Sequence, residues 1–508
     1  MKLKRDTLFR IANIGCILIF LLLCIFNSQI KYVWNDESFT LSMIPHSYLS
    51  IINFTAKDVH PFLYYWIAKF LSFSTTNIYA LIAIERLVSL LPYLLLLLIS
   101  FTYIKRFWGQ TVSLIFSVSV LLMPGILQYG EQIRMYSWAI LFVTCAFLNA
   151  LIILKQGSRN RFWVGLTVFS ILAAYTHYYA LLDVIFIYFI FLLCWRNQGF
   201  KFWKYLLSVV VDLLVYLPWI PAFLHQVSGV SADYWIGKFG PKRIVEFVLF
   251  PFTLINSIPG YLVAALLFLI IVAGLFVFLK EHRTHGNNCE IQYFETLGGI
   301  LPTLLVILAG TLISYVDRPI LISRYLVPGL GIFWFSISIL ISKTDHENLK
   351  KILLIAVFCL GTLNSVVYMR RMLIDNQSFQ TCNNFFRGVN KKTILIYDHP
   401  VTVSVCSYYL KNQNFVLENK NHDNGLGIYK AVYPNIAEIS AQRIKKILKS
   451  KPTYFIETNY NSNSLHKSRD ERKLLKYVKK HFMLKKQGQY QLPLDGNFNV
   501  YRVSKKSK

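Results

Sequence analysis

The chain of 508 residues is long enough for about three or four soluble domains, but its composition excludes that arrangement. It is 55% hydrophobic and only 15% charged, whereas soluble domains carry roughly 25% charged residues. The 53 Lys and Arg against 25 Asp and Glu give a net charge of +28, which in a membrane protein favours cytoplasmic loop anchors and contact with anionic lipid over nucleic-acid binding.

The first apolar run, residues 11–30, follows several basic residues and has no small-residue cleavage site. We therefore predict an uncleaved first helix with a cytoplasmic N-terminus. Roughly 20 apolar residues cross a bilayer as a helix, and ten further runs follow at about 78–104, 110–126, 135–154, 162–176, 179–195, 203–224, 261–279, 297–315, 320–342 and 352–369. The sequence thus predicts an α-helical polytopic membrane protein with about eleven transmembrane helices. The stretch 244–258, which contains Pro251, is expected to be re-entrant or interfacial.

Basic residues gather in every second predicted loop, and the loops between them are balanced or acidic. The basic loops hold Lys105 and Arg106, Lys155, Arg159 and Arg161, Arg196, Lys201 and Lys204, Lys280 and Arg283, and Lys343, Lys350 and Lys351. Because cytoplasmic loops carry the Lys and Arg excess, these loops are predicted to be cytoplasmic. The first extracytoplasmic loop is then about 31–77, and the chain is a multi-pass protein of the plasma membrane with its C-terminal region outside.

The remaining part of the chain, residues 370–508, has the composition of a soluble domain. We predict strands at 393–397, 428–432, 453–457 and 499–503, and helices at 436–448 and 468–481. We expect these elements to form a small, basic, extracytoplasmic α/β domain beyond a transmembrane helical domain over 1–369. Its basic runs indicate either a solvated face or a contact with anionic lipid or wall polymer. Cys382 and Cys406 lie in this region, and the sequence leaves open whether they form a disulfide.

Most ionisable residues at membrane depth fall at the outer ends of predicted helices, in five separate loops. They are Asp36, Glu37, Asp58, His60, Glu131, Arg134, His177, Asp317, Arg318 and Arg324. Such residues are expensive near the bilayer and usually functional, so a shared outward-facing cavity is predicted. Glu85 and Arg86 are expected instead to form an intrahelical pair.

The first extracytoplasmic loop carries the richest chemistry. Asp36 and Glu37 are adjacent carboxylates just beyond the first helix, where one can accept a proton while the other orients it or tunes its pKa; the alternative is a pair that caps a juxtamembrane helix. Further along the same loop the chain reads Asp58-Val59-His60-Pro61, which favours the functional interpretation.

Taken together, these segments resemble the GT-C glycosyltransferases, in particular the protein O-mannosyltransferases and the bacterial aminoarabinose transferase that modifies lipid A. The supporting segments are the acidic pair, the His-Pro segment, Gln128-Tyr129-Gly130-Glu131-Gln132-Ile133-Arg134-Met135-Tyr136, Thr176-His177-Tyr178-Tyr179 and Ser323-Arg324-Tyr325-Leu326. The resemblance covers about residues 1–345. Phe62 stands where relatives often have a second proline, which leaves the subfamily and its substrate open.

The resemblance implies an inverting transfer of a hexosyl or pentosyl sugar from a polyprenyl-phosphate donor to an extracytoplasmic glycan, lipid or protein acceptor. Asp36 is assigned as the general base, with Glu37 supporting or sharing that role. Arg134 and Arg324 are assigned to the carrier phosphate. The further binding residues are His60, His177, Asp58 and Tyr136. The aromatic run Tyr64-Tyr65-Trp66, which follows the His-Pro segment, either stacks on the sugar or guides the lipid chain of the donor, or only packs. No cofactor, metal-ligand cluster or nucleic-acid partner is predicted, and dependence on a divalent metal stays open.

Two other functions compete with the transferase. A transporter or flippase of lipid-linked saccharides often shows paired repeats with broken helices that meet at the bilayer midplane, whereas here the acidic residues concentrate on one face and the two halves do not match. A membrane scaffold that presents its C-terminal domain leaves the one-sided polar loops unexplained. The sequence therefore favours the transferase.

Overall fold

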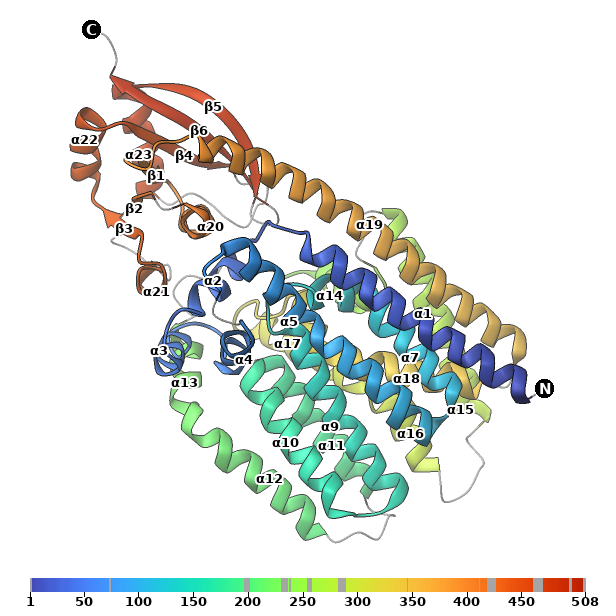
Figure 1. Cartoon of the computed structure of the whole chain (residues 1–508). Coiled ribbons are helices and arrows are strands. Elements are labelled where there is room, and N and C mark those ends of the chain that lie inside the picture. The colour runs from blue at the N-terminus through green and yellow to red at the C-terminus, as the bar shows by residue number, and fades with distance from the viewer. Residues whose placement is uncertain are drawn as a thin grey trace.

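The computed structural model describes residues 2–72, 75–195, 202–229, 236, 239–253, 258–281, 289–344, 346–410, 412–417, 426–459, 469–492 and 496–505. A bundle of long helices makes up most of the molecule, and a smaller α/β domain sits at one end of it (Figure 1). The last and longest helix of the bundle, α19 (Glu347–Arg387), runs along one side of the bundle and continues into the small domain. It therefore continues past residue 369, where the sequence places the domain boundary.

The bundle begins with α1 (Lys2–Ser28), α2 (Asn35–Met43), α3 (Tyr48–Thr55), α4 (Leu63–Leu71), α5 (Ile78–Ile99), η1 (Ser100–Ile104), α6 (Lys105–Trp108), α7 (Gln110–Leu122), α8 (Pro124–Gly130), α9 (Tyr136–Gln156), α10 (Asn160–Thr176) and α11 (Tyr178–Trp195). It continues with α12 (Phe202–Tyr216), η2 (Leu217–Trp219), α13 (Ile220–Gly229), α14 (Pro241–Leu249), η3 (Phe250–Phe252), α15 (Ile258–Glu281), α16 (Cys289–Leu297), α17 (Ile300–Val316), η4 (Ser323–Gly329), α18 (Leu330–Lys343) and α19.

Each of the eleven predicted spans coincides with a helix or with consecutive helices. By length and apolar composition, seven helices in the described part of the chain suit a membrane crossing, and up to nine do if the bent pairs α7–α8 and α16–α17 each count as one span. These pairs bend by 53° and 56°, and α8 begins at Pro124, which cannot donate the backbone hydrogen bond that a continuous helix needs. The apolar part of α11, Tyr178–Cys194, is shorter than the 18 residues required here of a helix that crosses the membrane.

The centre of the bundle is formed by α9 and α18, which are buried along almost their whole lengths. By contrast, α12 and α15 expose rows of leucines, as expected of helices that face lipid tails. At the end of the bundle far from the α/β domain, the buried Glu295 carboxylate accepts hydrogen bonds at 2.7 Å from Lys155 and Lys343. This network ties α16 to α9 and α18.

The α/β domain is built from one six-stranded sheet with the order β3-β2-β1-β4-β6-β5. Its elements are β1 (Ile394–Tyr397), α20 (Pro400–Tyr409), β2 (Asn414–Leu417), α21 (Leu426–Val432), β3 (Ile436–Ile439), α22 (Ala441–Ser450), β4 (Thr453–Asn459), α23 (Arg469–His481), β5 (Phe482–Leu492) and β6 (Gly496–Lys505). The first four strands in this order pair in parallel, and β6 pairs antiparallel with both β4 and β5.

Two sequence-based assignments in this domain are wrong. Residues 428–432 form part of helix α21 instead of a strand, because Tyr429 and Tyr433 turn toward α2 and hydrogen-bond there. The helix expected over 436–448 begins only at Ala441, because residues 436–439 pair with β2 as strand β3. Ser440 separates the two elements, and its hydroxyl accepts a hydrogen bond from the Arg443 amide as a helix cap.

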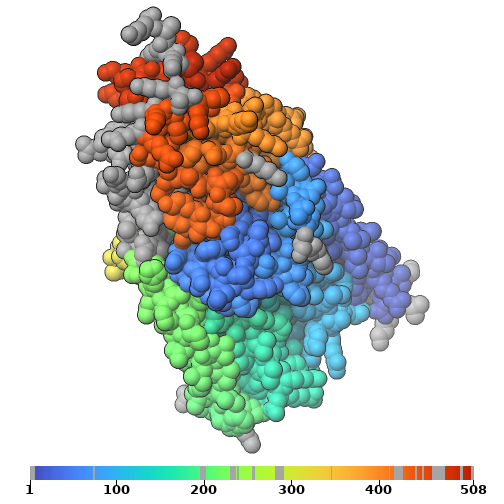
Figure 2. Space-filling model, turned by 60° about the vertical axis from the view of Figure 1, so that its left-hand side comes forward, coloured from blue at the N-terminus to red at the C-terminus, as the bar shows by residue number. Residues whose placement is uncertain are grey.

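The α/β domain docks on the short helices that follow α1. Figure 2 shows these helices, in blue, beneath the orange part of the C-terminal domain and above the green and teal bundle helices. Helices α20 and α21 both contact α2. The Tyr433 and Ser38 hydroxyls lie 2.9 Å apart, and the Asn35 side-chain amide donates to the Tyr429 hydroxyl at 3.1 Å. Cys382 and Cys406, whose pairing was left open, are buried free thiols.

Candidate functional site

The two adjacent carboxylates at the start of α2 have different environments. Glu37 is 1% exposed, and its carboxylate forms an ion pair with Arg86 of α5 at 3.2 Å. It also accepts hydrogen bonds from the backbone amides of Ile133 at 2.9 Å and Trp34 at 3.3 Å. A buried charge needs this degree of pairing, so Glu37 joins α2 to α5 and to the loop after α8.

Asp36 is the more accessible carboxylate of the pair. Its Oδ2 lies 3.4 Å from Nη1 of Arg324 in η4, and the Asp36 side chain is 22% exposed. The Arg324 guanidinium also lies over the Trp34 ring, 5.4 Å from its centre. Asp36 therefore faces an arginine from a helix almost 290 residues further along the chain, at a place that solvent or a ligand reaches.

Arg134 is buried directly beneath the start of α2. Its Nη1 donates to the Asp36 carbonyl at 3.3 Å, to the Thr40 hydroxyl at 3.4 Å and to the Tyr65 hydroxyl at 3.2 Å. Its Nε has no hydrogen-bond partner among the described residues. Arg134 is thus held in place by one end of its guanidinium, which leaves donor capacity for another acceptor.

Two histidines from different loops lie close together behind this cluster. The His60 and His177 rings are 5.4 Å apart, and His177 also lies 5.8 Å from the Tyr136 ring. Burial and the positive charges of Arg134 and Arg324 lower the pKa of His177 to about 3, and burial together with the same arginines lowers the pKa of His60. Both imidazoles are therefore neutral near pH 7.

The hydrogen bonds of His177 define its neutral tautomer. Its Nδ1 accepts a hydrogen bond from the Tyr179 amide at 3.1 Å, so the proton of the neutral ring is on Nε2. That Nε2 atom is buried and has no partner within the described ranges. His177 therefore offers an N–H donor to a ligand.

Asp58 is half-buried in the turn between α3 and α4. Burial raises the pKa of its carboxyl to about 6, although the Arg134 charge and a hydrogen bond from the Val59 amide act in the opposite direction. The negative charge of Asp36 adds to the rise. Asp58 therefore changes its charge close to neutral pH, which an ordinary aspartate does not.

Not all of the outer polar residues join this cluster. The structure brings together Asp36, Asp58, His60, Arg134, Tyr136, His177 and Arg324. Asp317 instead pairs with Arg318 at 3.5 Å on the surface. Glu131 is buried and accepts a hydrogen bond from Asn27 at 2.8 Å, and burial raises its pKa to about 7.

The prediction that Glu85 and Arg86 form an ion pair is wrong. Arg86 turns away from its neighbour to Glu37, and the Glu85 carboxylate has no hydrogen-bond partner among the described residues. Sequence reasoning also missed Trp34, which contacts Arg324 through its ring. Its position two residues before the acidic pair was the available signal.

The described residues contain no group of three or more His, Cys, Asp or Glu side chains arranged to hold a metal ion. The cationic groups of the cluster are the two arginines, and the ionisable acids that face them are Asp36 and Asp58. This arrangement combines an accessible carboxylate with two guanidinium groups, which are well suited to binding a phosphate.

No family model and no curated protein matches the sequence. Among solved structures, the chain is similar to ArnT from Cupriavidus metallidurans, both in the apo state and bound to undecaprenyl phosphate, with a TM-score of 0.60 at 12% sequence identity. The alignment covers 96% of this chain and 97% of ArnT. An Archaeoglobus fulgidus oligosaccharyltransferase, in complex with zinc and sulfate, is aligned over 88% of this chain and 68% of its own, with 11% identity and a TM-score of 0.45.

The likeness to ArnT extends over nearly the full length of both chains, so the C-terminal domain is part of the shared fold. The expected fold class, a polytopic helical body that carries a small C-terminal α/β domain, is therefore confirmed as an ArnT-like fold. At 12% identity the likeness concerns the fold, and the chemistry has to be argued from the residues of this chain.

Proposed function

We propose that this protein is an inverting glycosyltransferase that moves a sugar from a polyprenyl-phosphate donor to an acceptor outside the cytoplasm. The observation that carries the proposal is the accessible carboxylate of Asp36 beside Arg324, with Arg134 buried beneath it. A base and two phosphate-binding cations are the groups that such a transfer needs. The likeness to ArnT, which has been solved with undecaprenyl phosphate, supports a lipid phosphate as the leaving group.

In this reaction the acceptor hydroxyl attacks the anomeric carbon of the donor sugar and passes its proton to Asp36. The bond between that carbon and the phosphate oxygen breaks, and its electron pair leaves with the lipid phosphate. A single displacement of this kind inverts the anomeric configuration. Glu37 is the positioning residue, because its pairing with Arg86 fixes the start of α2.

The negative charge that develops on the leaving phosphate is stabilised by Arg134 and Arg324. Neutral His177 donates its Nε2–H to the same group, with His60 beside it. Tyr136 packs against His177 and shapes the site. Ionised Asp58 accepts a hydrogen bond from a hydroxyl of the sugar. The side chains around this cluster determine whether the donor sugar is a hexose or a pentose. They also determine whether the acceptor is a glycan, a lipid or a protein.

The phosphate assignment predicts weaker donor binding when an arginine is neutralised. Arg134→Gln and Arg324→Gln should each weaken binding of undecaprenyl phosphate roughly 10- to 100-fold, the range expected for one hydrogen bond to a charged group. Native mass spectrometry of the purified protein measures this directly. Arg106→Gln, which changes an exposed arginine of α6, is the control and should bind as the wild type does. Unchanged binding in both cluster variants would remove the arginines from the phosphate site.

The charge of Asp58 predicts an acidic limb in the pH profile. Since the pKa of Asp58 is raised to about 6, the carboxylate is ionised above that pH and protonated below it. We expect kcat/KM to fall as the pH drops through about 6, and Asp58→Asn to lower activity and abolish that limb. The histidines do not titrate in this range because they are already neutral. An acidic limb that persists in Asp58→Asn would contradict the assignment.

We place the N-terminus in the cytoplasm and the α/β domain outside, which puts the Asp36 cluster on the extracytoplasmic side. Single cysteines introduced at Asp317 and Lys391 should then react with a membrane-impermeant maleimide in intact cells, and one at Lys105 should react only after lysis. The native cysteines are removed beforehand. Labelling of the cysteine at position 105 without lysis would show the opposite topology. The cluster would then lie on the wrong side of the membrane for a lipid-linked donor.

A further inference from the structure

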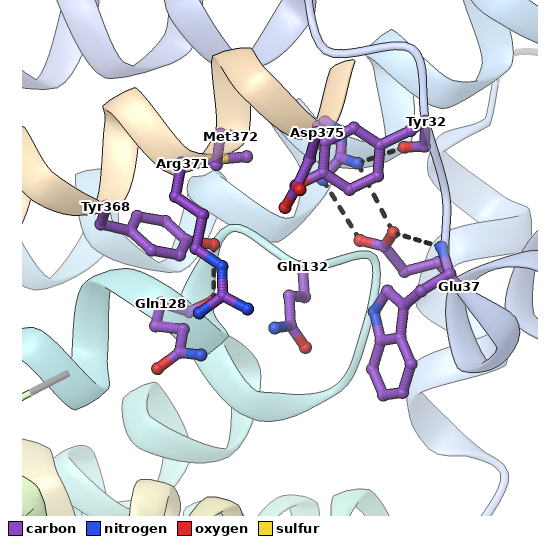
Figure 3. A pocket seen from close by; sticks show the side chains of 10 residues that line it. Tyr32, Glu37, Gln128, Gln132, Tyr368, Arg371, Met372 and Asp375 are labelled. Carbon is purple, nitrogen blue, oxygen red and sulfur yellow. Dashed lines mark hydrogen bonds and ion pairs between the residues drawn. The ribbon is translucent and has the colours of Figure 1, made fainter. Parts of the chain in front are cut away.

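The helical bundle and the C-terminal domain both hold the start of α2, the helix that carries Asp36. The bundle holds Glu37, whose carboxylate pairs with Arg86 and accepts a hydrogen bond from the Trp34 amide (Figure 3). The C-terminal domain holds Asn35, to which α20 and α21 both bond. Asp36 therefore has one chain neighbour fixed by the bundle and the other fixed by the C-terminal domain.

Two hydroxyl groups of the C-terminal domain fix the side-chain amide of Asn35. Its Oδ1 accepts a hydrogen bond from the Ser404 hydroxyl of α20. The Tyr429 hydroxyl of α21 lies 3.2 Å from the same Oδ1 and 3.1 Å from Nδ2. Ser404 is fully buried, and Asn35 and Tyr429 are half-buried. Because a hydroxyl both donates and accepts, Tyr429 can bond to either end of the amide, and the three groups form one network.

The same amide reaches the carboxylate of Asp36. Its Nδ2 donates to Oδ1 of Asp36 at 3.5 Å, while Oδ2 of Asp36 faces Arg324 at 3.4 Å. The reverse orientation of the amide would set its oxygen against the carboxylate, and both groups are acceptors. Both contacts of the carboxylate are long for hydrogen bonds, so its orientation depends on how firmly its two partners are held. Asn35 is held by the C-terminal domain.

Another hydroxyl of the C-terminal domain docks on this part of the chain without reaching Asn35. Tyr409, at the end of α20, donates to the Lys31 carbonyl at 2.8 Å. Lys31 lies five residues before Asp36 and outside α2. Tyr409 and Tyr429 therefore both attach the domain to the chain around α2, but Tyr429 bonds to the residue that contacts the Asp36 carboxylate.

We propose that the C-terminal domain positions the base of the transferase. Ser404 and Tyr429 fix the Asn35 amide, and Asn35 in turn orients the Asp36 carboxylate toward the acceptor hydroxyl. This inference rests on the proposed function. Asn35 is a positioning residue, because it acts on the proton of the acceptor only through Asp36. A misplacement of about 1 Å can cost about 100-fold in rate, so the domain is a working part of the enzyme as well as an attachment to the helical body.

Transfer by the full-length protein in nanodiscs tests this inference. The donor is the lipid fraction, and the acceptor the cell-envelope fraction, of a strain that lacks the gene. Asn35→Ala should lower kcat about 10- to 100-fold at an unchanged half-saturating amount of donor, since the arginines still hold the phosphate. Ser404→Ala and Tyr429→Phe should each lower kcat less, because one hydroxyl remains. Tyr429→Phe keeps the ring contact with Phe39. Tyr409→Phe is the matched control and should keep the wild-type kcat.

A double variant separates positioning from a general structural effect. In an Asp36→Asn background, Asn35→Ala should lower the residual rate no further, because the carboxylate through which Asn35 acts is already gone. A loss of folded protein would instead lower the rate in both backgrounds alike.

Each outcome decides the inference. A lower kcat in Asn35→Ala and Tyr429→Phe, with wild-type kcat in Tyr409→Phe and no further loss in the Asp36→Asn background, supports it. Wild-type kcat in Asn35→Ala overturns it, as does an equal loss in Tyr409→Phe or in the Asp36→Asn background. In these cases the wild type still transfers sugar, so the proposed function stands. A wild type that transfers no sugar would overturn both proposals.

Discussion

Replacing Asp36 with asparagine is expected to lower kcat about 100- to 10,000-fold, the range that general-base catalysis contributes. Asparagine keeps the size of the side chain and removes its basicity. Donor binding should survive, because the arginines hold the phosphate and the lost carboxylate competes with it for Arg324. A transfer assay with purified protein, together with native mass spectrometry of the lipid phosphate, separates the two effects.

Asp317→Asn is the matched control for this experiment. Asp317 also pairs with an arginine, Arg318, at 3.5 Å, but it is exposed and lies outside the cluster. The Asp317→Asn protein should therefore transfer sugar at close to the wild-type rate. An Asp36→Asn protein that does the same would remove the proposed base, and Asp58 would be the next carboxylate to examine.

Arg86→Met is expected to be the most destabilising single change near the site. It leaves Glu37 as a buried carboxylate held only by two backbone amides, and removing one partner of a buried ion pair costs about 3–5 kcal/mol. Glu37→Gln should destabilise the protein less. The amide oxygen can still accept from the Ile133 amide, and Arg86 keeps the Tyr32 carbonyl at 2.7 Å.

Thermal unfolding in detergent measures these differences. The double variant Glu37→Gln with Arg86→Met should recover part of the loss, since no buried charge then lacks its partner. Lys430→Met, which breaks an exposed pair with Glu438, is the control and should cost no more than about 1 kcal/mol. Equal destabilisation by Arg86→Met and Lys430→Met would mean that the Glu37 pairing does not fix the start of α2.

The sequence predicted the helical body well because apolar runs long enough to cross a bilayer have few alternative structures. It predicted the C-terminal domain less well. The helix α21 depends on tyrosines that dock on α2, almost 400 residues earlier in the chain, and no local pattern records that contact. The strand β5 carries a polar and basic sequence, and it forms because β6 pairs with it.

The same distinction applies to the site. Residue types and their order pointed to Asp36, Arg134 and Arg324, which the fold brings together. The separate environments of Asp36 and Glu37 could not be foreseen, because they depend on Arg86, which is 49 residues away from Glu37 and next to an acid that seemed its natural partner. Pairing across the bundle is set by packing, which the local sequence does not encode.

The central claim is that the Asp36 cluster transfers a sugar from a lipid phosphate. Its most direct test is mass spectrometry of cell-envelope glycans and lipid-linked sugars in a deletion strain complemented with wild type or with Asp36→Asn. We expect one envelope sugar to be lost and its lipid-linked donor to accumulate in both the deletion strain and the Asp36→Asn strain, and wild type to restore the sugar. An unchanged set of envelope sugars and lipid-linked donors in the deletion strain would contradict the claim.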